Sequence, residues 1–215
     1  MNNLFRGMVF ILAIAVLPGG HAQAQVVGCP DWELSIIVQD IQADTALLVI
    51  PDGSGPPLTE ARHYSGTMAD ATIYLTLYSS CPPTGPMVGY PAEDMWLEST
   101  EGSLVFCSGG SIADAPTDDQ GSTTWSRPLA GGGQDTGTCV IRISGGDSPS
   151  LFSFPLQFNS PDLNADLVVN LTDVVEFAED FFDADYEFRS DLHFDFVVNL
   201  SDLSEMAGAI GTACP

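Results

Sequence analysis

Short apolar and β-branched runs recur between residues 26 and 160, and turn-forming residues separate each run from the next. The segments Pro51–Pro57 (PDGSGPP) and Gly131–Gly133 are typical of such turns, and no helical period runs through this part of the chain. The pattern predicts a domain of about seven short strands. The expected strands are Trp32–Gln39, Ala46–Ile50, Ala71–Tyr78, Ser103–Cys107, Ser122–Ser126, Cys139–Ser144 and Leu151–Phe158.

A helical period begins after residue 160. In two places apolar residues follow the spacing i, i+3, i+4 and i+7, which predicts a short amphipathic helix with one buried face. We expect two helices whose apolar faces pack against each other, and we place the domain boundary at 160/161 with almost no linker. The two faces are Val174, Phe177, Ala178 and Phe181, and Leu203, Met206, Ala207 and Ile210.

One turn in the β region has a more specific pattern. Residues Thr117–Trp125 (TDDQGSTTW) join an Asp/Gly turn to an alternating strand, which resembles the hairpin of bacterial immunoglobulin-like (Ig-like) repeats. Together with the number of strands, this implies an Ig-like β-sandwich over residues 26–160. The expected fold class is therefore mainly β, a sandwich followed by a small α-helical module at residues 161–215.

The N-terminus predicts export. Met8–Leu17 (MVFILAIAVL) is an apolar run of ten residues, and Ala22-Gln23-Ala24 provides the small residues that signal peptidase requires. We therefore expect residues 1–24 to be a cleaved signal peptide. An alternative is that Val26–Cys29 (VVGC) is a lipobox and that Cys29 is lipidated. No second apolar run approaches membrane length, so a secreted or surface location without a membrane span is expected.

The charge restricts the possible partners. The chain carries a net charge of −24, with 29 acidic residues, five arginines and no lysine. Few side chains are available to neutralise phosphates, so nucleic acid is excluded as a partner. The same balance favours cations.

The tail contains an internal duplication. Residues 162–178 (DLNADLVVNLTDVVEFA) and 191–207 (DLHFDFVVNLSDLSEMA) are identical at ten of seventeen positions, at an offset of 29. Calcium binds six to eight oxygens, which a twelve-residue loop supplies from positions 1, 3, 5, 7, 9 and 12. The candidate donors are Asp162, Asn164, Asp166, the Val168 carbonyl, Asn170 through water and Asp173, then Asp191, His193, Asp195, the Val197 carbonyl, Asn199 and Asp202.

Two loop–helix units with Asp at position 12 resemble the type I dockerin, over residues 162–211. The resemblance implies that each repeat binds one calcium ion and that the folded pair docks onto a cohesin. We expect the position-8 residues Val169 and Val198 to turn inward. The residues expected to cap the helices are Thr172 with Asp173 and Ser201 with Asp202.

The sequence departs from the dockerin pattern at several positions. Position 6, usually Gly for its left-handed turn, is Leu167 and Phe196, which costs of order 1 kcal/mol or more in each loop. Position 3 of the second copy is His193, a poor ligand for a hard cation. We therefore expect calcium at the first site and weak or no binding at the second. The positions by which dockerins recognise the cohesin also depart from the family pattern, which counts against a cohesin itself as partner. In this chain these positions are Leu171-Thr172, Ala178-Glu179, Leu200-Ser201 and Ala207-Gly208.

Five cysteines lie outside the signal peptide, and none forms a CxxC pair. Disulfides are the default in an exported protein. The pair Cys81–Cys107 is expected because both residues follow predicted strands. Cys214 is either a leftover thiol or bonds to Cys29, which would fasten the tail to the β domain; both pairings leave Cys139 free.

No nucleophile elbow, P-loop or zinc-protease motif is present, and the expected function is non-catalytic. The acids Glu93, Asp94, Glu98 and Glu101 are scattered, as this composition predicts. Two hypotheses remain. The first is an extracellular or surface protein whose calcium-binding tail serves folding, docking or assembly, with a cohesin-like or other extracellular domain as partner. The second is an accessory protein that binds glycan through Trp96, whereas Trp32 and Trp125 are expected in the core.

Overall fold

A computed structural model describes residues 29–31, 35–38, 41, 43–144, 154–183 and 185–215. The expected signal peptide lies outside these residues, as does Trp32. Cys29, the last residue of the candidate lipobox, lies inside them. Among the described residues, no helix has the length and apolar character that crossing a membrane requires.

The described chain is mainly β, which confirms the expected class. It has many short strands and two α-helices, α1 (Leu171–Phe182) and α2 (Leu200–Ala209), both in the tail. Short 3-10 helices cover Leu58–Glu60, Ala92–Asp94 and Phe188–Ser190. The strands are β1 (Ile36–Val38), β2 (Thr45–Leu48), β3 (Ala61–His63), β4 (Thr67–Ala69), β5 (Ile73–Thr76), β6 (Tyr78–Ser79), β7 (Gly85–Pro86), β8 (Met95–Ser99), β9 (Val105–Phe106), β10 (Ser122–Trp125), β11 (Gly131–Gly132), β12 (Cys139–Ile143) and β13 (Gln157–Asn159).

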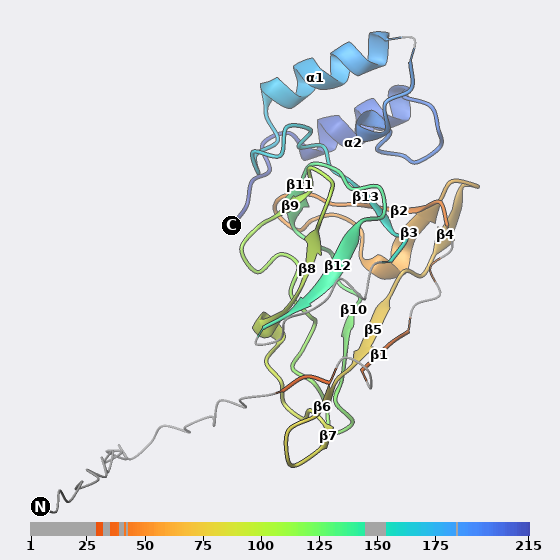
Figure 1. Cartoon of the computed structure of the whole chain (residues 1–215). Coiled ribbons are helices and arrows are strands. Elements are labelled where there is room, and N and C mark those ends of the chain that lie inside the picture. The colour runs from red at the N-terminus through yellow and green to blue at the C-terminus, as the bar shows by residue number, and fades with distance from the viewer. Residues whose placement is uncertain (1–28, 32–34, 39–40, 42, 145–153, 184) are drawn as a thin grey trace, which may run out of the picture.

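The strands form several small sheets (Figure 1). The largest has the order β13-β2-β3-β4, and its β13–β2 pair is parallel. A three-stranded sheet has the order β1-β5-β10, and β8 pairs with β12 over five residues on each strand. The remaining pairs are β9 with β11 and β6 with β7.

Each of the seven predicted runs overlaps at least one observed strand. The pattern missed β3, β4 and β8, and it assigned β7 and β11 to turns. In β8, Met95 and Leu97 are buried and Glu98 is only partly buried, so the strand alternates between buried and more exposed positions. The turn at Asp118–Gly121 leads into β10 as expected: the Asp118 carboxylate accepts hydrogen bonds from the Gln120 and Ser122 N–H groups.

Both faces of β2 are buried, each against a different core. Leu47 belongs to the core of the β domain, together with Ile73, Leu75 and Trp125. Trp125 is 1% exposed and donates its indole N–H to the Ser111 carbonyl, so its expected place in the core is confirmed. The other face of β2, formed by Ala46 and Leu48, packs against the tail.

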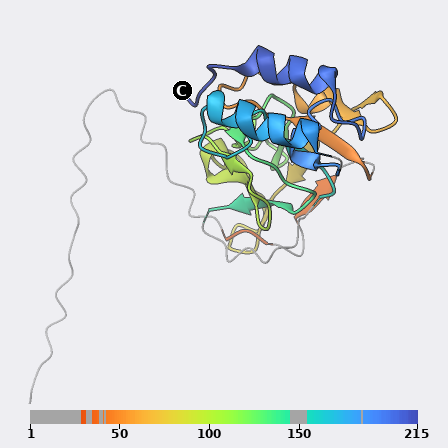
Figure 2. The same ribbon diagram turned by 90° about the horizontal axis from the view of Figure 1, so that it is seen from above.

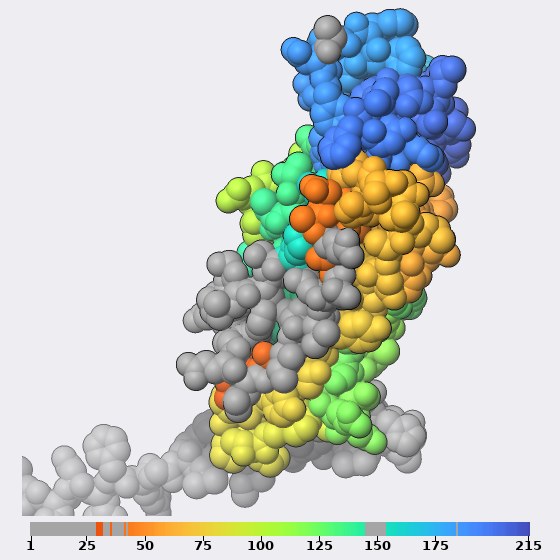
Figure 3. Space-filling view, turned by 90° about the vertical axis from the view of Figure 1, so that its right-hand side faces the viewer, coloured from red at the N-terminus to blue at the C-terminus, as the bar shows by residue number. Residues whose placement is uncertain are grey.

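The tail covers one end of the β domain (Figure 3). Seen from above, α1 and α2 lie side by side across that end (Figure 2). In α1, all four residues of the predicted apolar face are partly or fully buried, and Phe177 is fully buried. The face predicted for α2 was largely wrong, because Leu203, Ala207 and Ile210 are exposed. Instead α2 buries Met206 and Ala209, because β2 supplies the partner surface that was expected from the other helix.

Two disulfides join four of the five cysteines, but with pairings other than those expected. Cys29 bonds to Cys81, and Cys107 bonds to Cys214. The pairs Cys81–Cys107 and Cys29–Cys214 were therefore wrong, while the free and buried Cys139 agrees with expectation. A disulfide does fasten the tail to the β domain, through Cys107. Bonding to Cys81 uses the sulfur of Cys29 that lipidation would require.

Candidate metal-binding loops

The two predicted loops, residues 162–173 (loop one) and 191–202 (loop two), have matching backbones. Position 6 is left-handed in both, with φ of 68° at Leu167 and 65° at Phe196, as expected. Position 4 is left-handed as well, with φ of 60° at Ala165 and 58° at Phe194, which the sequence did not predict. Residues other than glycine rarely adopt this backbone conformation unless the surrounding structure imposes it. The loops therefore share one tightly curled shape despite lacking glycine.

Internal hydrogen bonds hold loop one in this shape. The carboxylate of Asp162 accepts from the N–H groups of Asp166 (3.2 Å) and Leu167 (2.7 Å). The carboxylate of Asp173 closes the loop from its other end, since it accepts from the N–H groups of Asn164 (3.3 Å) and Asn170 (2.8 Å). The first and last predicted ligands are thus brought to the same curled segment.

Loop two repeats the arrangement bond for bond. Asp191 accepts from the N–H groups of Asp195 (3.1 Å) and Phe196 (2.9 Å). Asp202 accepts from those of His193 (2.8 Å) and Asn199 (2.8 Å). The duplication in the sequence is therefore also a duplication of conformation.

The position-9 asparagines start the helices. Asn170 is the N-cap of α1 and accepts from the Thr172 N–H, and Asp173 completes a capping box. Asn199 and Asp202 do the same for α2. The expected role of the position-12 aspartates in capping is confirmed, but Thr172 and Ser201 are not the capping residues. An Asn amide oxygen reaches the second helical N–H directly, so it takes the N-cap position.

The first and last carboxylates of both loops are completely buried. Asp162, Asp173, Asp191 and Asp202 each have 0% exposure. Burial raises the pKa of Asp162 above its usual range, opposed by the Leu167 N–H and reinforced by the charge of Asp173. Burial likewise raises the pKa of Asp202. Within the described chain, none of these four forms an ion pair with an arginine. Buried negative charge without a counter-charge favours a bound cation.

The donors of loop one fit calcium. In the described residues no three carboxylate, imidazole or thiol groups gather closely enough to hold an ion by themselves. Calcium also uses amide and carbonyl oxygens, and loop one has them in Asn164, Asn170 and the Val168 carbonyl. Val169 at position 8 is fully buried, and Val198 packs against the same core, as expected. All six predicted donors of loop one supply oxygen.

Loop one rests on a glycine strand of the β domain. The Gly133 N–H donates to the Asp162 carbonyl (2.7 Å). At Gly132, in β11, an added Cβ would lie 1.8 Å from an Asp162 carboxylate oxygen. From sequence this glycine run was expected to form a turn, with no role near the tail. The absence of a side chain at residue 132 is what allows the first predicted ligand to lie against the β domain.

We therefore expect Gly132→Ala to displace the Asp162 carboxylate and to weaken calcium binding roughly 10- to 100-fold, the usual effect of disturbing a residue that positions a metal ligand. The affinity is measured by calorimetric titration of the folded variant. Gly208→Ala is the control, because a Cβ on this α2 residue meets nothing within 4 Å. Equal affinities in the two variants would contradict the proposed contact.

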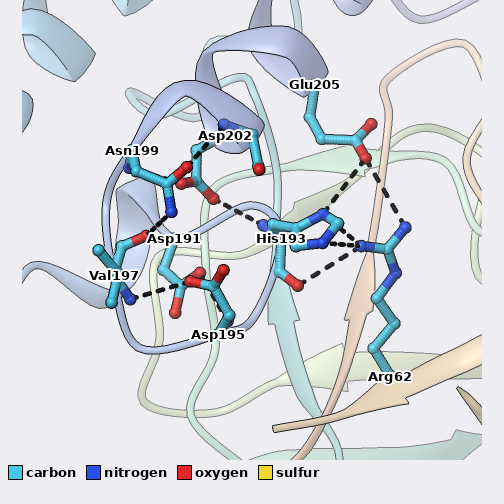
Figure 4. Close-up of polar contacts among 9 residues, drawn as sticks. Arg62, Asp191, His193, Asp195, Val197, Asn199, Asp202 and Glu205 are labelled. Atoms are coloured by element: carbon cyan, nitrogen blue, oxygen red, sulfur yellow. Dashed lines mark hydrogen bonds and ion pairs between the residues drawn. The ribbon is translucent and has the colours of Figure 1, made fainter. Parts of the chain in front are cut away.

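Loop two has different neighbours (Figure 4). His193 points away from Asp191 and Asp195, toward Arg62 and Glu205. Arg62 Nη1 lies 2.5 Å from His193 Nδ1, and Arg62 Nη2 lies 3.7 Å from a Glu205 oxygen. Position 3 of loop two therefore supplies no oxygen, and its donors do not fit calcium as those of loop one do.

Other contacts to loop two were not found from sequence. Tyr186 donates its hydroxyl to Asp191 (2.8 Å), and the Asn159 amide donates to the Asp191 carbonyl (3.0 Å). Tyr186 has no tyrosine counterpart in the first repeat, where residue 157 is Gln. A contact made by one copy alone is not part of the pattern that the two repeats share.

Comparison with known proteins finds no matching family model, no matching curated protein and no matching solved structure. The function proposed for this chain therefore depends on its own residues and their contacts.

Proposed function

We propose that this is an exported, non-catalytic extracellular or surface protein whose dockerin-like tail binds calcium in loop one, next to an Ig-like β domain. The bound ion stabilises the tail for docking or assembly. One observation carries the proposal. Asp162 and Asp173, at the two ends of a curled loop, are fully buried without an arginine partner in the described chain.

The electrostatics of the tail support the same function. Residues 161–215 contain thirteen acidic residues and a single basic one, Arg189. That arginine is already engaged by α1, at 2.7 Å from Asp180 and 3.0 Å from Glu176. Its charge is therefore paired with carboxylates of α1 and does not neutralise loop one. A divalent cation is the available means of neutralising Asp162, Asp166 and Asp173.

The outer surface of the tail supports a docking role. Leu171 and Leu200 occupy the same position of the two repeats, and their exposed fractions are 75% and 71%. Phe182, at the end of α1, is 84% exposed. Exposed apolar side chains of this size are suited to a protein partner. The proposed partner is a cohesin-like or other extracellular domain.

The experiment is a calorimetric titration of residues 25–215 with calcium, and with magnesium for comparison. We expect saturable calcium binding, because a flexible set of oxygens suits calcium better than the strictly octahedral magnesium. Failure to bind at millimolar calcium would overturn the proposed function.

A second candidate function, glycan binding, is favoured by a hollow beside Trp96. This partly buried residue of β8 lines an open hollow of about 420 Å³, with Glu93, Glu98 and Phe106. A Trp ring can stack on a sugar, and carboxylates accept hydrogen bonds from sugar hydroxyls. The ligand would be a neutral oligosaccharide, since the net charge of −24 disfavours anionic ones.

For this second function we expect Trp96→Ala to remove glycan-array binding without unfolding the protein. Tyr74→Ala is the control, because Tyr74 is 50% exposed on β5 and does not line the hollow. If wild-type protein binds no glycan, or if both variants bind equally, the hollow is not a glycan site.

A further inference from the structure

The two calcium-type loops have the same conformation but differ at a few nearby positions of their sequence. Within the twelve residues, the repeats differ at positions 3, 4, 6 and 11, and the change at position 11 is only Thr to Ser. The other three changes convert Asn164, Ala165 and Leu167 of loop one into His193, Phe194 and Phe196 of loop two. These three residues of loop two share one neighbour, the β domain.

The β domain contacts all three of these residues. Arg62 of β3 donates to the His193 ring (2.5 Å) and to the His193 carbonyl (3.5 Å). Tyr64, which directly follows β3, stacks on Phe196 with ring centroids 3.9 Å apart and an angle of 16° between the planes. It also makes a T-shaped contact with Phe194, with ring centroids 6.2 Å apart. The small or aliphatic residues of loop one offer no such surface.

The buried carboxylate of loop two has an additional donor. Tyr186 donates its hydroxyl to Asp191 Oδ2, which also accepts from the Phe196 N–H. In loop one the equivalent oxygen of Asp162 accepts only from the Leu167 N–H among the described residues. Asp191 is thus stabilised by three hydrogen bonds within the protein, which reduces the need for a metal at this end of the loop.

We propose that loop two is a metal-independent clasp, held in its curled shape without calcium by Tyr186 on Asp191 and by Arg62 and Tyr64 on its outer side chains, so that the chain binds one calcium ion, in loop one. The clasp holds the tail on β3 whether or not calcium is present. The stoichiometry rests on the proposed calcium-binding function, whereas the clasp itself does not. Two features exclude calcium from loop two: a guanidinium charge beside the loop, and a position-3 side chain turned outward to meet it.

The first test is the number of ions bound, measured by native mass spectrometry and calorimetry on residues 25–215. Wild-type protein is expected to bind one ion. The double variant Arg62→Ala/His193→Asn removes the guanidinium and restores the oxygen ligand of loop one, so we expect it to bind a second ion. Two ions bound to the wild type, or no gain in the double variant, would overturn the proposal.

The second test does not need calcium to bind. In chelator, backbone amides of loop two should exchange with deuterium more slowly than those of loop one, and Arg62→Met with Tyr64→Ala should remove this difference. The same pair should lower the Tm in chelator by about 2–4 °C. The control is Arg127→Met, since Arg127 pairs with Asp114 within the β domain. Equal exchange of the two loops in wild-type protein would refute the clasp.

The two tests also separate this inference from the proposed function. A wild-type protein that binds no calcium but shows a protected loop two would contradict the function and support the clasp. A wild-type protein that binds two ions would support calcium binding and contradict the clasp.

Discussion

Removing the Cys107–Cys214 disulfide is expected to lower the free energy of unfolding by about 4–5 kcal/mol, the value that the chain-entropy model gives for a loop of roughly 100 residues. The two cysteines are 107 positions apart, and Cys214 is the penultimate residue of the chain. The bond fastens the end of the tail to the region of β9, so the unfolded chain gains much freedom without it. Denaturant unfolding of Cys107→Ser/Cys214→Ser measures the loss.

The control for this prediction is Cys139→Ser, which removes the free buried thiol and leaves both disulfides intact. Non-reducing peptide mapping of the wild type should yield one peptide pair containing Cys29 and Cys81, and another containing Cys107 and Cys214. A peptide joining Cys81 to Cys107 would contradict the pairing. Wild-type stability in the double variant would show that the bond does not hold the tail.

Calcium is expected to raise the Tm of the protein by about 5–10 °C over its value in chelator. If free calcium is ~100-fold above Kd, binding to the folded state adds about 2.7 kcal/mol, and each kcal/mol shifts a domain of this size by about 2–4 °C. Asp166→Ala should abolish the difference, because this residue supplies an oxygen of loop one. Thermal melts of the wild type and of Asp166→Ala, each with calcium and with chelator, measure both effects.

Asp195→Ala is the matched control. Both aspartates are exposed, occupy position 5 of their loops and accept one hydrogen bond from the N–H two residues later, at 3.0 Å in loop one and 3.1 Å in loop two. Asp195→Ala should therefore keep the calcium-dependent shift. A shift lost equally in both variants would contradict binding at loop one alone, and identical wild-type melts would contradict calcium stabilisation.

Local features of the site could be predicted from the sequence because neighbouring residues determine them. The repeat placed two loops and two helices correctly, and the missing glycines at Leu167 and Phe196 indicated left-handed strain that the structure has. The carboxylates that close each loop lie within twelve residues of one another. Such contacts require little chain closure, so spacing alone encodes them.

Contacts between distant parts of the chain were decided only by the tertiary structure. The four cysteines predicted to form disulfides do form them. Their pairing was wrong because it depends on which Cα atoms come within about 7 Å of each other, and residue spacing does not give that distance. The apolar face of α2 was misjudged because its partner is β2, more than 150 residues earlier. Arg62 and His193 are likewise 131 residues apart. The sequence by itself determined two similar loops, and only the folded β domain made them different, because it presents Gly132 to one loop and Arg62 and Tyr64 to the other.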